Sequence, residues 1–308
     1  MSVYTSVGRD ELSAWLQPLG LGELISHVGI AAGMQNSNYF VTTASGRYVL
    51  TLFERIEPQA LDFYLTLMAR LAGRGIPCPQ PLADAAGQLW RPLSGKPAAL
   101  LSCLPGTADE TPTPARCRLL GATLAEMHAA AADLPDPLPN PCGAAWRQAI
   151  GTALLPLLAA DESKLLKEEL AFQQAQDYSA LPRGIIHADL FRDNVLWDAH
   201  GQLGGVLDFY FAGEDALLFD LAVVANDWCF DAEALAALID GYASRRQLSA
   251  AELAAWPAIR RAAALRFWLL RLEVRHQPRQ GDVVTIKDPD HFRRMLQGFR
   301  LAPEALSR

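Results

Sequence analysis

A short stretch near residue 190 carries the polar groups that phosphoryl transfer requires. It reads His187-Ala188-Asp189, has Asn194 five residues after that Asp, and is followed by Asp208 at the end of an apolar run. A carboxylate can orient a hydroxyl for attack on a phosphate, and the oxygens of an Asn and an Asp suit Mg2+ when phosphate and water supply its other ligands. The spacing therefore predicts Asp189 as the catalytic residue, with Asn194 and Asp208 as metal ligands.

Apolar runs around these residues indicate how they are positioned. Three runs are typical of short buried strands separated by turns: Ile185-Ile186, Val195-Leu196-Trp197 and Gly204-Gly205-Val206-Leu207. His187 is then expected to brace the loop, and Asp220 to anchor it or to cap a helix. In the alternative interpretation, His187 is a core imidazole, and the polar residues after it only satisfy turn backbone. That alternative does not account for Asp208.

Composition excludes several classes of protein. The chain has 308 residues, which exceeds the usual size of a domain with a single hydrophobic core, so we expect two lobes. Its 51% hydrophobic and 20% charged residues are typical of a folded globular protein. A net charge of -7 provides no field that attracts nucleic acid or acidic lipid. The five cysteines are odd in number and show no Cys-x-x-Cys spacing, which argues against a disulfide framework and a zinc site.

The same reasoning gives expectations for location and partners. The first ten residues lack a basic region followed by an apolar stretch, and no run is long enough to span a bilayer. We therefore expect a cytoplasmic protein that acts on a small molecule and binds neither nucleic acid nor a membrane. Monomer and homodimer are both compatible with the sequence.

The order of predicted elements indicates an α+β fold of two unlike lobes. The first hundred residues predict a small antiparallel sheet with one long helix, from a helix over 9–25, strands over 38–43 and 47–53, a helix over 58–72, and strands over 88–93 and 97–103. The remainder is mostly helical, with helices predicted over 114–134, 144–158, 162–177, 216–228, 232–244 and 250–276. We expect a nucleotide-binding lobe over 1–103 and a catalytic and substrate-binding lobe over 104–308.

The stretch from Gly29 to Asn38 is the candidate cover for the nucleotide phosphates. Gly33 could let backbone amides approach the phosphates, and the side chains of Asn36, Ser37 and Asn38 could donate hydrogen bonds. An ordinary hairpin turn would have a similar sequence. At the connector between the lobes, Ser102 and Leu104 would meet the adenine of ATP through backbone groups.

Taken together, these motifs resemble the aminoglycoside phosphotransferase and choline kinase superfamily. The resemblance rests on the glycine-bearing first hairpin, the Leu104-Pro105-Gly106 connector, His187 to Asn194, Leu207-Asp208-Phe209 and Phe219 to Ala222. It implies a protein-kinase-like fold, Mg-ATP as phosphate donor, Asp189 as the catalytic base, and Asn194 and Asp208 as magnesium ligands.

Within that superfamily, four further stretches look like the homoserine kinases of bacteria. They are Gln35 to Val41, Tyr48 to Glu54, Asn226 to Cys229, and Leu265 to Leu272. This resemblance implies that the hydroxyl of L-homoserine is phosphorylated to O-phospho-L-homoserine, a step of threonine biosynthesis. One departure is Thr51, which stands where kinases of this fold usually carry a Lys or Arg that pairs with the nucleotide phosphates.

The charge of the substrate predicts the groups that bind it. Homoserine is a zwitterion, so its pocket needs a cation for the carboxylate and acceptors for the ammonium. Arg266 and Arg271 supply the first, and Asn226 and Asp227 the second. Because the two arginines are five residues apart, they point about 140° apart on a helix, and only one of them is expected to reach the substrate.

Two other hypotheses stay open on the sequence. The same chemistry could serve choline, another amino alcohol or an aminoglycoside, and Trp228, Phe267 and Trp268 would suit an aromatic cage for choline. Aromatic residues at helical spacing are, however, more often part of a core. The other hypothesis is a nucleotide-binding regulatory protein without catalysis, which Thr51 would favour.

Overall fold

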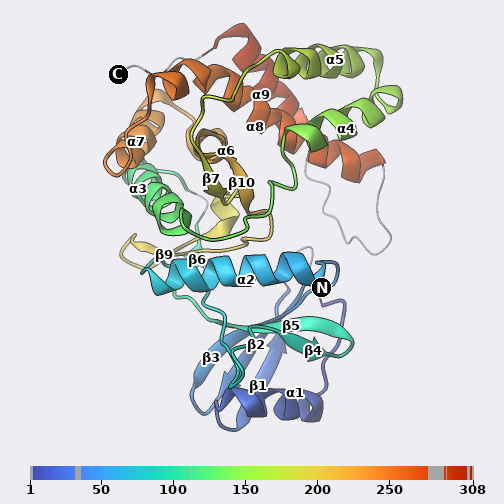
Figure 1. The fold of residues 1–308 in the computed structure, drawn as a ribbon, viewed down its shortest axis with the longest axis vertical. Coiled ribbons are helices and arrows are strands. Elements are labelled where there is room, and N and C mark those ends of the chain that lie inside the picture. The colour runs from blue at the N-terminus through green and yellow to red at the C-terminus, as the bar shows by residue number, and fades with distance from the viewer. Residues whose placement is uncertain are drawn as a thin grey trace. The chain divides into compact units, whose positions relative to one another are not determined.

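The computed structural model describes residues 3–31, 36–109, 111–276, 288, 290–303 and 306. These residues form two compact units (Figure 1). The first comprises the described part of 1–106 together with 204–207, and the second comprises the described part of 107–203 and of the chain from Asp208 onward. Each unit is described by itself. The first unit ends close to the predicted boundary at 103/104, and the assignment of nucleotide and substrate binding to separate lobes stays a prediction.

The first unit contains a five-stranded antiparallel sheet in the order β1-β2-β3-β5-β4. Its strands are β1 (Leu24–Gly29), β2 (Ser37–Thr43), β3 (Gly46–Leu52), β4 (Arg91–Leu93) and β5 (Lys96–Ser102). The hairpin between β2 and β3 turns tightly, pairing Thr43 with Gly46, which has a φ of 146°. The long helix α2 (Pro58–Gly73) begins with its proline in the first turn, where a missing N–H costs nothing. This sheet and its one long helix confirm the predicted small antiparallel sheet with one long helix, although β1 was not among the predicted strands.

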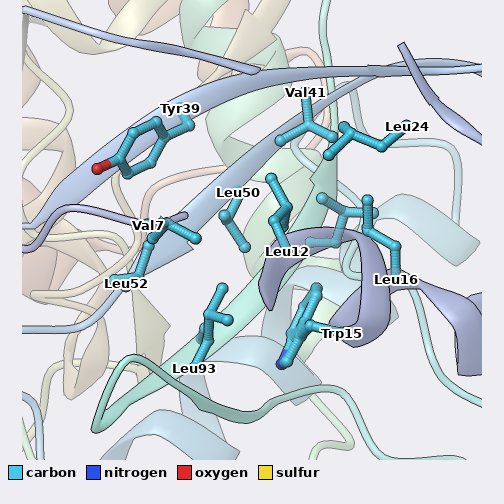
Figure 2. Close-up of a cluster of buried hydrophobic side chains, with 12 residues drawn as sticks. Val7, Leu12, Trp15, Leu16, Leu24, Tyr39, Val41, Leu50, Leu52 and Leu93 are labelled. Carbon is cyan, nitrogen blue, oxygen red and sulfur yellow. The ribbon is translucent and has the colours of Figure 1, made fainter. Parts of the chain in front are cut away.

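A helix before the sheet closes the core on one side. Helix α1 (Arg9–Leu16) buries Leu12, Trp15 and Leu16 against a cluster that includes Val41 of β2 and Leu50 of β3 (Figure 2). Leu12, Val41 and Leu50 have no exposed surface. Alternate residues of β2 are buried, as expected for a sheet with one face on a core.

The helix predicted over 9–25 is wrong in its second half. Helix α1 ends at Leu16, a 3-10 turn follows over Gln17–Leu19, and Gly20 adopts a left-handed φ of 67° before β1 begins at Leu24. Pro18 cannot donate the backbone hydrogen bond that a continuing α-helix needs, and glycine takes the left-handed conformation without steric cost. The prediction followed the apolar residues past these two breaks.

The second unit is built from helices around two small sheets. Its helices are α3 (Pro114–Ala131), α4 (Ala144–Leu154), α5 (Ala160–Gln174), α6 (Leu217–Trp228), α7 (Ala232–Ala243), α8 (Ala250–His276) and α9 (Asp290–Leu301). Helix α3 lies beside α7, and α8 packs against both α6 and α9 (Figure 1). Helix α6 is buried along its whole length, so it forms the centre of this unit. None of the described helices is both long and apolar enough to cross a membrane.

Short strands hold the polar loops of the second unit. Strand β7 (Arg183–Ile186) pairs antiparallel with β10 (Gly213–Ala216), and β6 (Thr107–Ala108) pairs with β8 (Val195–Trp197). Strand β9 (Leu203–Val206) runs from the second unit into the first, where the N–H of Val206 donates to the carbonyl of Pro77 at 2.8 Å. Strands β7, β8 and β9 confirm the three short strands predicted around the polar stretch. Strands β6 and β10 and helix α9 were not predicted.

Candidate active site

The predicted catalytic loop begins at the end of β7. His187 follows the strand directly, Ala188 has a left-handed φ of 66°, and a 3-10 turn over Arg192–Asn194 leads into β8. Asp208 also has a positive φ, 61°. Residues other than glycine rarely adopt this conformation, and where they do, surrounding contacts must hold them there. The loop therefore requires anchors, and helix α6 supplies them.

Asp220, in the first turn of α6, anchors the start of the loop. Its two carboxylate oxygens accept the backbone N–H groups of His187 and Ala188, each at 2.8 Å. Asp220 has no exposed surface, and Nε2 of His128 lies 3.0 Å from Oδ2. Burial raises the pKa of Asp220, but the hydrogen bond and charge of His128, together with the charge and backbone amide of His187, outweigh that effect, so the pKa lies below its ordinary value. Asp220 is thus held as a carboxylate that fastens the left-handed turn at Ala188.

His128 belongs to a buried polar chain that sequence reasoning missed. Its Nδ1 lies 2.9 Å from the hydroxyl of Tyr242, so one imidazole joins α3, α6 and α7. Only 5% of His128 is exposed, in a helix whose neighbouring buried positions are apolar. A His on such a face must find polar partners. That requirement was the available signal, although it does not say which residues the partners are.

Asp227, in the last turn of α6, anchors the other end of the loop. Its Oδ2 accepts the backbone N–H of Arg192 at 2.8 Å and the Nε of the same residue at 3.1 Å. The indole N–H of Trp228 donates to the carbonyl of Leu190 at 3.3 Å. Two carboxylates at opposite ends of one buried helix therefore hold the loop between them.

Asp189 and Asn194 meet within this frame. The Nδ2 of Asn194 donates to the backbone carbonyl of Asp189 at 2.8 Å and lies 3.3 Å from its carboxylate. The N–H of Asp189 donates to Nδ1 of His187 at 3.1 Å, and the His187 ring is 2% exposed and 4.7 Å from the ring of Phe209. Because Nδ1 accepts a hydrogen bond, the ring acts here as a brace, as the sequence predicts. Asp189 keeps a partly exposed surface.

The predicted metal ligands have suitable chemistry. The bonds of Asn194 Nδ2 to Asp189 turn its Oδ1, the oxygen that a cation takes, to the other side of the amide. The surrounding protein desolvates Asp208 and raises its pKa to about 6, against the opposing amide of Tyr210 and with the Asp193 carboxylate adding to the rise. Its side chain nevertheless keeps an exposed surface, and a cation there would favour the ionised form.

A metal ion here would need ligands from outside the protein as well as from Asn194 and Asp208. Within the described ranges, no three His, Cys, Asp or Glu side chains are grouped to hold a metal ion. Two protein oxygens, from Asn194 and Asp208, fit an ion whose other ligands are phosphate and water. The donor set thus agrees with the predicted use of magnesium on a nucleotide.

The predicted substrate residues lie in different environments. The side-chain amide of Asn226 makes two hydrogen bonds to Arg260. Its Nδ2 donates to the backbone carbonyl of Arg260 at 3.0 Å, and its Oδ1 accepts from Nε of Arg260 at 3.0 Å. Arg271 donates to the carbonyl of Asp288 at 2.6 Å. Arg266 is fully buried and donates to the carbonyl of Ala188 in the catalytic loop. The structure therefore brings Arg266, and Asp227 through Arg192, to the loop.

The predicted phosphate cover has mostly structural bonds among the residues described. Gly33 lies outside the described residues. Ser37 accepts the backbone N–H groups of two N-terminal residues and donates to Glu54 Oε1 at 2.7 Å. Asn38 accepts from Thr51 Oγ1 at 2.8 Å, and the buried Oδ1 of Asn36 has no hydrogen-bond partner in the described part of the chain. Nucleotide binding by these residues stays a prediction.

The connector shows a similar arrangement within the first unit. The hydroxyl of Ser102 accepts the N–H of Gln80 at 2.9 Å, and the N–H of Ser102 donates to the carbonyl of Gln80 at 2.9 Å. Leu104 packs so closely on Gly205 that a Cβ added to this glycine would lie 2.3 Å from Leu104 Cδ1. These contacts position the connector, and its contact with adenine stays a prediction.

Comparison with known proteins agrees with this geometry. The family model described as phosphotransferase enzyme family matches residues 26–264. A homoserine kinase of Methylobacillus flagellatus is 46% identical, with 99% of this chain and 98% of the relative covered. A homoserine kinase of Neisseria meningitidis serogroup B is also 46% identical, with 96% of this chain and 99% of the relative covered.

Solved structures share the fold at low sequence identity. A spectinomycin phosphotransferase in complex with ADP and spectinomycin has a TM-score of 0.70 at 14% identity, covering 96% of this chain and 98% of that one. The choline kinase LicA of Streptococcus pneumoniae has a TM-score of 0.68 at 16% identity, covering 96% and 100%. The α+β, protein-kinase-like fold is thereby confirmed. The chain belongs to the phosphotransferase enzyme family, and the homoserine kinases are its relatives over nearly their whole length.

Proposed function

We propose that this protein transfers the γ-phosphoryl group of ATP to the side-chain hydroxyl of L-homoserine, giving O-phospho-L-homoserine and ADP. The observation that carries the proposal is the anchored loop of Asp189 and Asn194, with Asp208 after β9, in a chain 46% identical to a homoserine kinase over nearly its full length. The loop supports phosphoryl transfer, and the relatives support the choice of acceptor.

Asp189 carries the acceptor side of the proposed reaction. As the hydroxyl oxygen of homoserine bonds to the γ-phosphorus and the bond to the ADP oxygen breaks, the hydroxyl proton passes to the Asp189 carboxylate. Asn194, whose Nδ2 lies 3.3 Å from that carboxylate, holds its orientation. His187 is not the base in this scheme, because its ring is buried and Nδ1 already accepts the Asp189 N–H.

Asn194 and Asp208 carry the nucleotide side. They would hold Mg2+, which neutralises charge on the nucleotide phosphates when it is bound. Oxygen ligands favour this ion over softer metals. With Thr51 buried and bonded to Asn38, the usual lysine of kinases has no counterpart at this position. Backbone amides and the metal ion would then hold the phosphates.

A coupled ADP-release assay across candidate acceptors tests the proposal. L-homoserine, choline, ethanolamine, kanamycin and methylthioribose are compared at equal concentrations with Mg-ATP. We expect saturable turnover with homoserine and less than about one hundredth of that kcat/KM with the others, because each of them lacks at least one of the two charges of the zwitterion. Turnover of another acceptor with none of homoserine would overturn the choice of substrate.

The non-catalytic alternative has its own outcome. If the wild-type protein binds Mg-ATP but transfers phosphate to no acceptor, a regulatory nucleotide-binding role replaces the kinase. If transfer occurs in the wild type and is lost in Asp189→Asn while Mg-ATP binding persists, that alternative is rejected.

A further inference from the structure

Arg266 lies against the catalytic loop in an unusual setting for a charged side chain. It stands on α8 with no exposed surface, and its Nη1 donates to the carbonyl of Ala188, the residue before Asp189. The guanidinium carbon lies 5.0 Å from the ring centroid of Phe211 and 4.4 Å from that of Phe267. Two aromatic rings and one carbonyl therefore restrict where the guanidinium plane points.

The Nε and Nη2 edge of this guanidinium has no hydrogen-bond acceptor within the described ranges. Nε and Nη2 of Arg266 are both buried, and neither has a hydrogen-bond partner among the residues that the structure describes. Their N–H groups point in the same direction and form the side-on edge, which takes both oxygens of a carboxylate. Buried donors are almost always satisfied, so the unpaired edge of a guanidinium that already bonds to the catalytic loop suits a ligand with an anionic, two-oxygen group.

A carboxylate stands on the same face of α8. Glu273 follows Arg266 by seven residues, about 700° of helix rotation, so the two side chains leave the helix within about 20° of each other. Glu273 keeps a partly exposed surface. This face of the helix therefore carries a cation and an anion, the two kinds of group that bind a zwitterion.

A buried thiol reports that these charges converge near Asp189. Burial raises the pKa of Cys142, the charge of the Arg266 guanidinium and a hydrogen bond from it act in the opposite direction, and the carboxylates of Asp189 and Glu273 add to the rise. Cys142 is 4% exposed. One thiol thus lies within electrostatic reach of the catalytic carboxylate, the guanidinium and the second carboxylate.

We propose that the Nε and Nη2 edge of Arg266 binds the α-carboxylate of the amino-acid substrate and that Glu273 accepts its ammonium group, while Asp189 receives its hydroxyl. The inference rests on the proposed function and names the groups that select its substrate. Arg271, which bonds to the carbonyl of Asp288 and stacks 4.3 Å from the Phe292 ring, does not take the carboxylate.

Two truncated alcohols separate the two subsites. 3-Amino-1-propanol is homoserine without its carboxylate, and 4-hydroxybutyrate is homoserine without its ammonium. The kcat/KM of each is compared with that of L-homoserine in the wild type, Arg266→Met, Arg266→Lys and Glu273→Gln. Where an analogue turns over too slowly, its competitive inhibition constant against homoserine replaces kcat/KM.

Each substitution is expected to lower one of the two substrate preferences and to leave the other unchanged. In Arg266→Met, the preference for homoserine over 3-amino-1-propanol falls by about 100-fold, because a two-bond ionic contact is lost, while the preference over 4-hydroxybutyrate changes less than about twofold. Arg266→Lys keeps the charge but not the side-on edge, so its preference for homoserine over 3-amino-1-propanol should lie between those of Arg266→Met and the wild type. In Glu273→Gln, the preference over 4-hydroxybutyrate falls by about tenfold, and the other preference is retained.

Ratios of substrates keep the test independent of a general loss of activity. A role of Arg266 in holding only Ala188 would lower the turnover of all three alcohols by one factor and leave their ratios unchanged, which overturns the carboxylate subsite. Unchanged ratios in Glu273→Gln overturn the ammonium subsite. Arg275→Met, at an exposed position in the last turn of α8, is the matched control and should leave all three ratios within twofold.

Failure of the proposed function gives a different result. If wild-type protein turns over 3-amino-1-propanol better than homoserine, the amino acid is not the substrate, and the assignment of both subsites falls with it. If the wild type prefers homoserine but the ratios do not move in the variants, homoserine phosphorylation stands and only the subsite assignment is rejected.

Discussion

The catalytic loop of the second unit and the strand pair β2 and β3 of the first unit use polar side chains in opposite ways. Backbone N–H groups of the loop donate to Asp220 and Asp227, which are buried on α6. The side chains of Asp189 and Asn194, in the loop itself, keep partly exposed surfaces. In the strand pair, Thr51 bonds to Asn38 within the sheet, and Thr51 is 2% exposed.

This difference indicates which polar side chains are available to a reactant. A polar group whose hydrogen bonds hold the fold together is not available to a reactant without cost, because a broken buried hydrogen bond must be replaced. The candidate catalytic loop would separate the two tasks, since helix α6 supplies the structural carboxylates and the loop supplies Asp189, the carboxylate proposed to react. Changes in the loop should therefore alter activity, changes in its anchors both activity and stability, and a change at Thr51 stability alone.

The largest effect is expected for the reactive carboxylate. Asp189→Asn keeps the shape of the side chain but cannot accept the hydroxyl proton, so kcat should fall by about 1,000-fold or more. The melting temperature should change by less than about 2 °C, because the anchors of the loop are untouched. Steady-state kinetics and thermal unfolding check both. A large loss of stability in this variant would mean that Asp189 is an anchor as well.

Asp208→Asn should lower activity and raise stability. It removes a proposed metal ligand, so kcat should fall by about 100-fold or more. The pKa of Asp208 is raised to about 6, above its ordinary value of 3.8, so folding favours the protonated form and the ionised side chain costs stability above pH 6. In the absence of metal, the variant should melt at a higher temperature than the wild type at pH 8.

The pH dependence of this stability difference checks the direction of the pKa shift of Asp208. As the pH falls from about 6 toward 4, the wild-type carboxyl becomes protonated and the advantage of the Asn variant should shrink. Asp198 is the opposite case, because the amides of Gln202 and His200 hold its pKa below its ordinary value. An Asp198→Asn variant should therefore be no more stable than the wild type at pH 8, and a gain there equal to that of Asp208→Asn would contradict the account.

An anchor should affect both properties. Asp220→Asn can accept only one of the two N–H groups of His187 and Ala188, and it loses the charge that faces His128. We expect the free energy of unfolding to fall by about 3 kcal/mol and kcat to fall by about tenfold. Denaturant unfolding and kinetics measure them on the same preparation.

The control for this anchor is an exposed carboxylate. Asp240 pairs with Arg118 at the surface, with more than half of each side chain exposed, so Asp240→Asn should cost less than about 0.5 kcal/mol and leave kcat unchanged. If Asp220→Asn behaved like this control, the loop would not depend on α6.

The smallest effect is expected in the strand pair. Thr51→Val removes the hydroxyl that donates to Asn38 and keeps the side-chain volume. The free energy of unfolding should fall by about 1 kcal/mol, and kcat should change by less than twofold. Loss of Mg-ATP binding in this variant would show that Thr51 takes part in nucleotide binding, and the contrast between the two regions would fail.

The grouping of His187, Asp189 and Asn194 could be predicted from the sequence because they lie in one local stretch, while their roles stay a prediction. His187, Asp189 and Asn194 fall within eight consecutive residues, and strands on either side define where they point. The sheet of the first unit was predictable for the same reason, since hairpins pair residues that are close in the chain.

The partners of the anchors could not be predicted because they are distant in sequence. The contact between His128 and Asp220 joins residues 92 positions apart, and that between Arg266 and Ala188 joins residues 78 apart. Helical periodicity indicates that such residues are on a buried face but not what they meet there. The wrong end of α1 had a local cause, because the breaks at Pro18 and Gly20 were outweighed by apolar residues that belong to β1.

Direct detection of the product tests the central claim. The purified protein is incubated with Mg-ATP and L-homoserine, and the phosphorus spectrum is followed alongside that of Asp189→Asn. The account predicts a new phosphate monoester, O-phospho-L-homoserine, formed in equal amount to ADP by the wild type and absent with the variant. ADP formed without the phosphate ester, or the ester formed at an unchanged rate by Asp189→Asn, would contradict it.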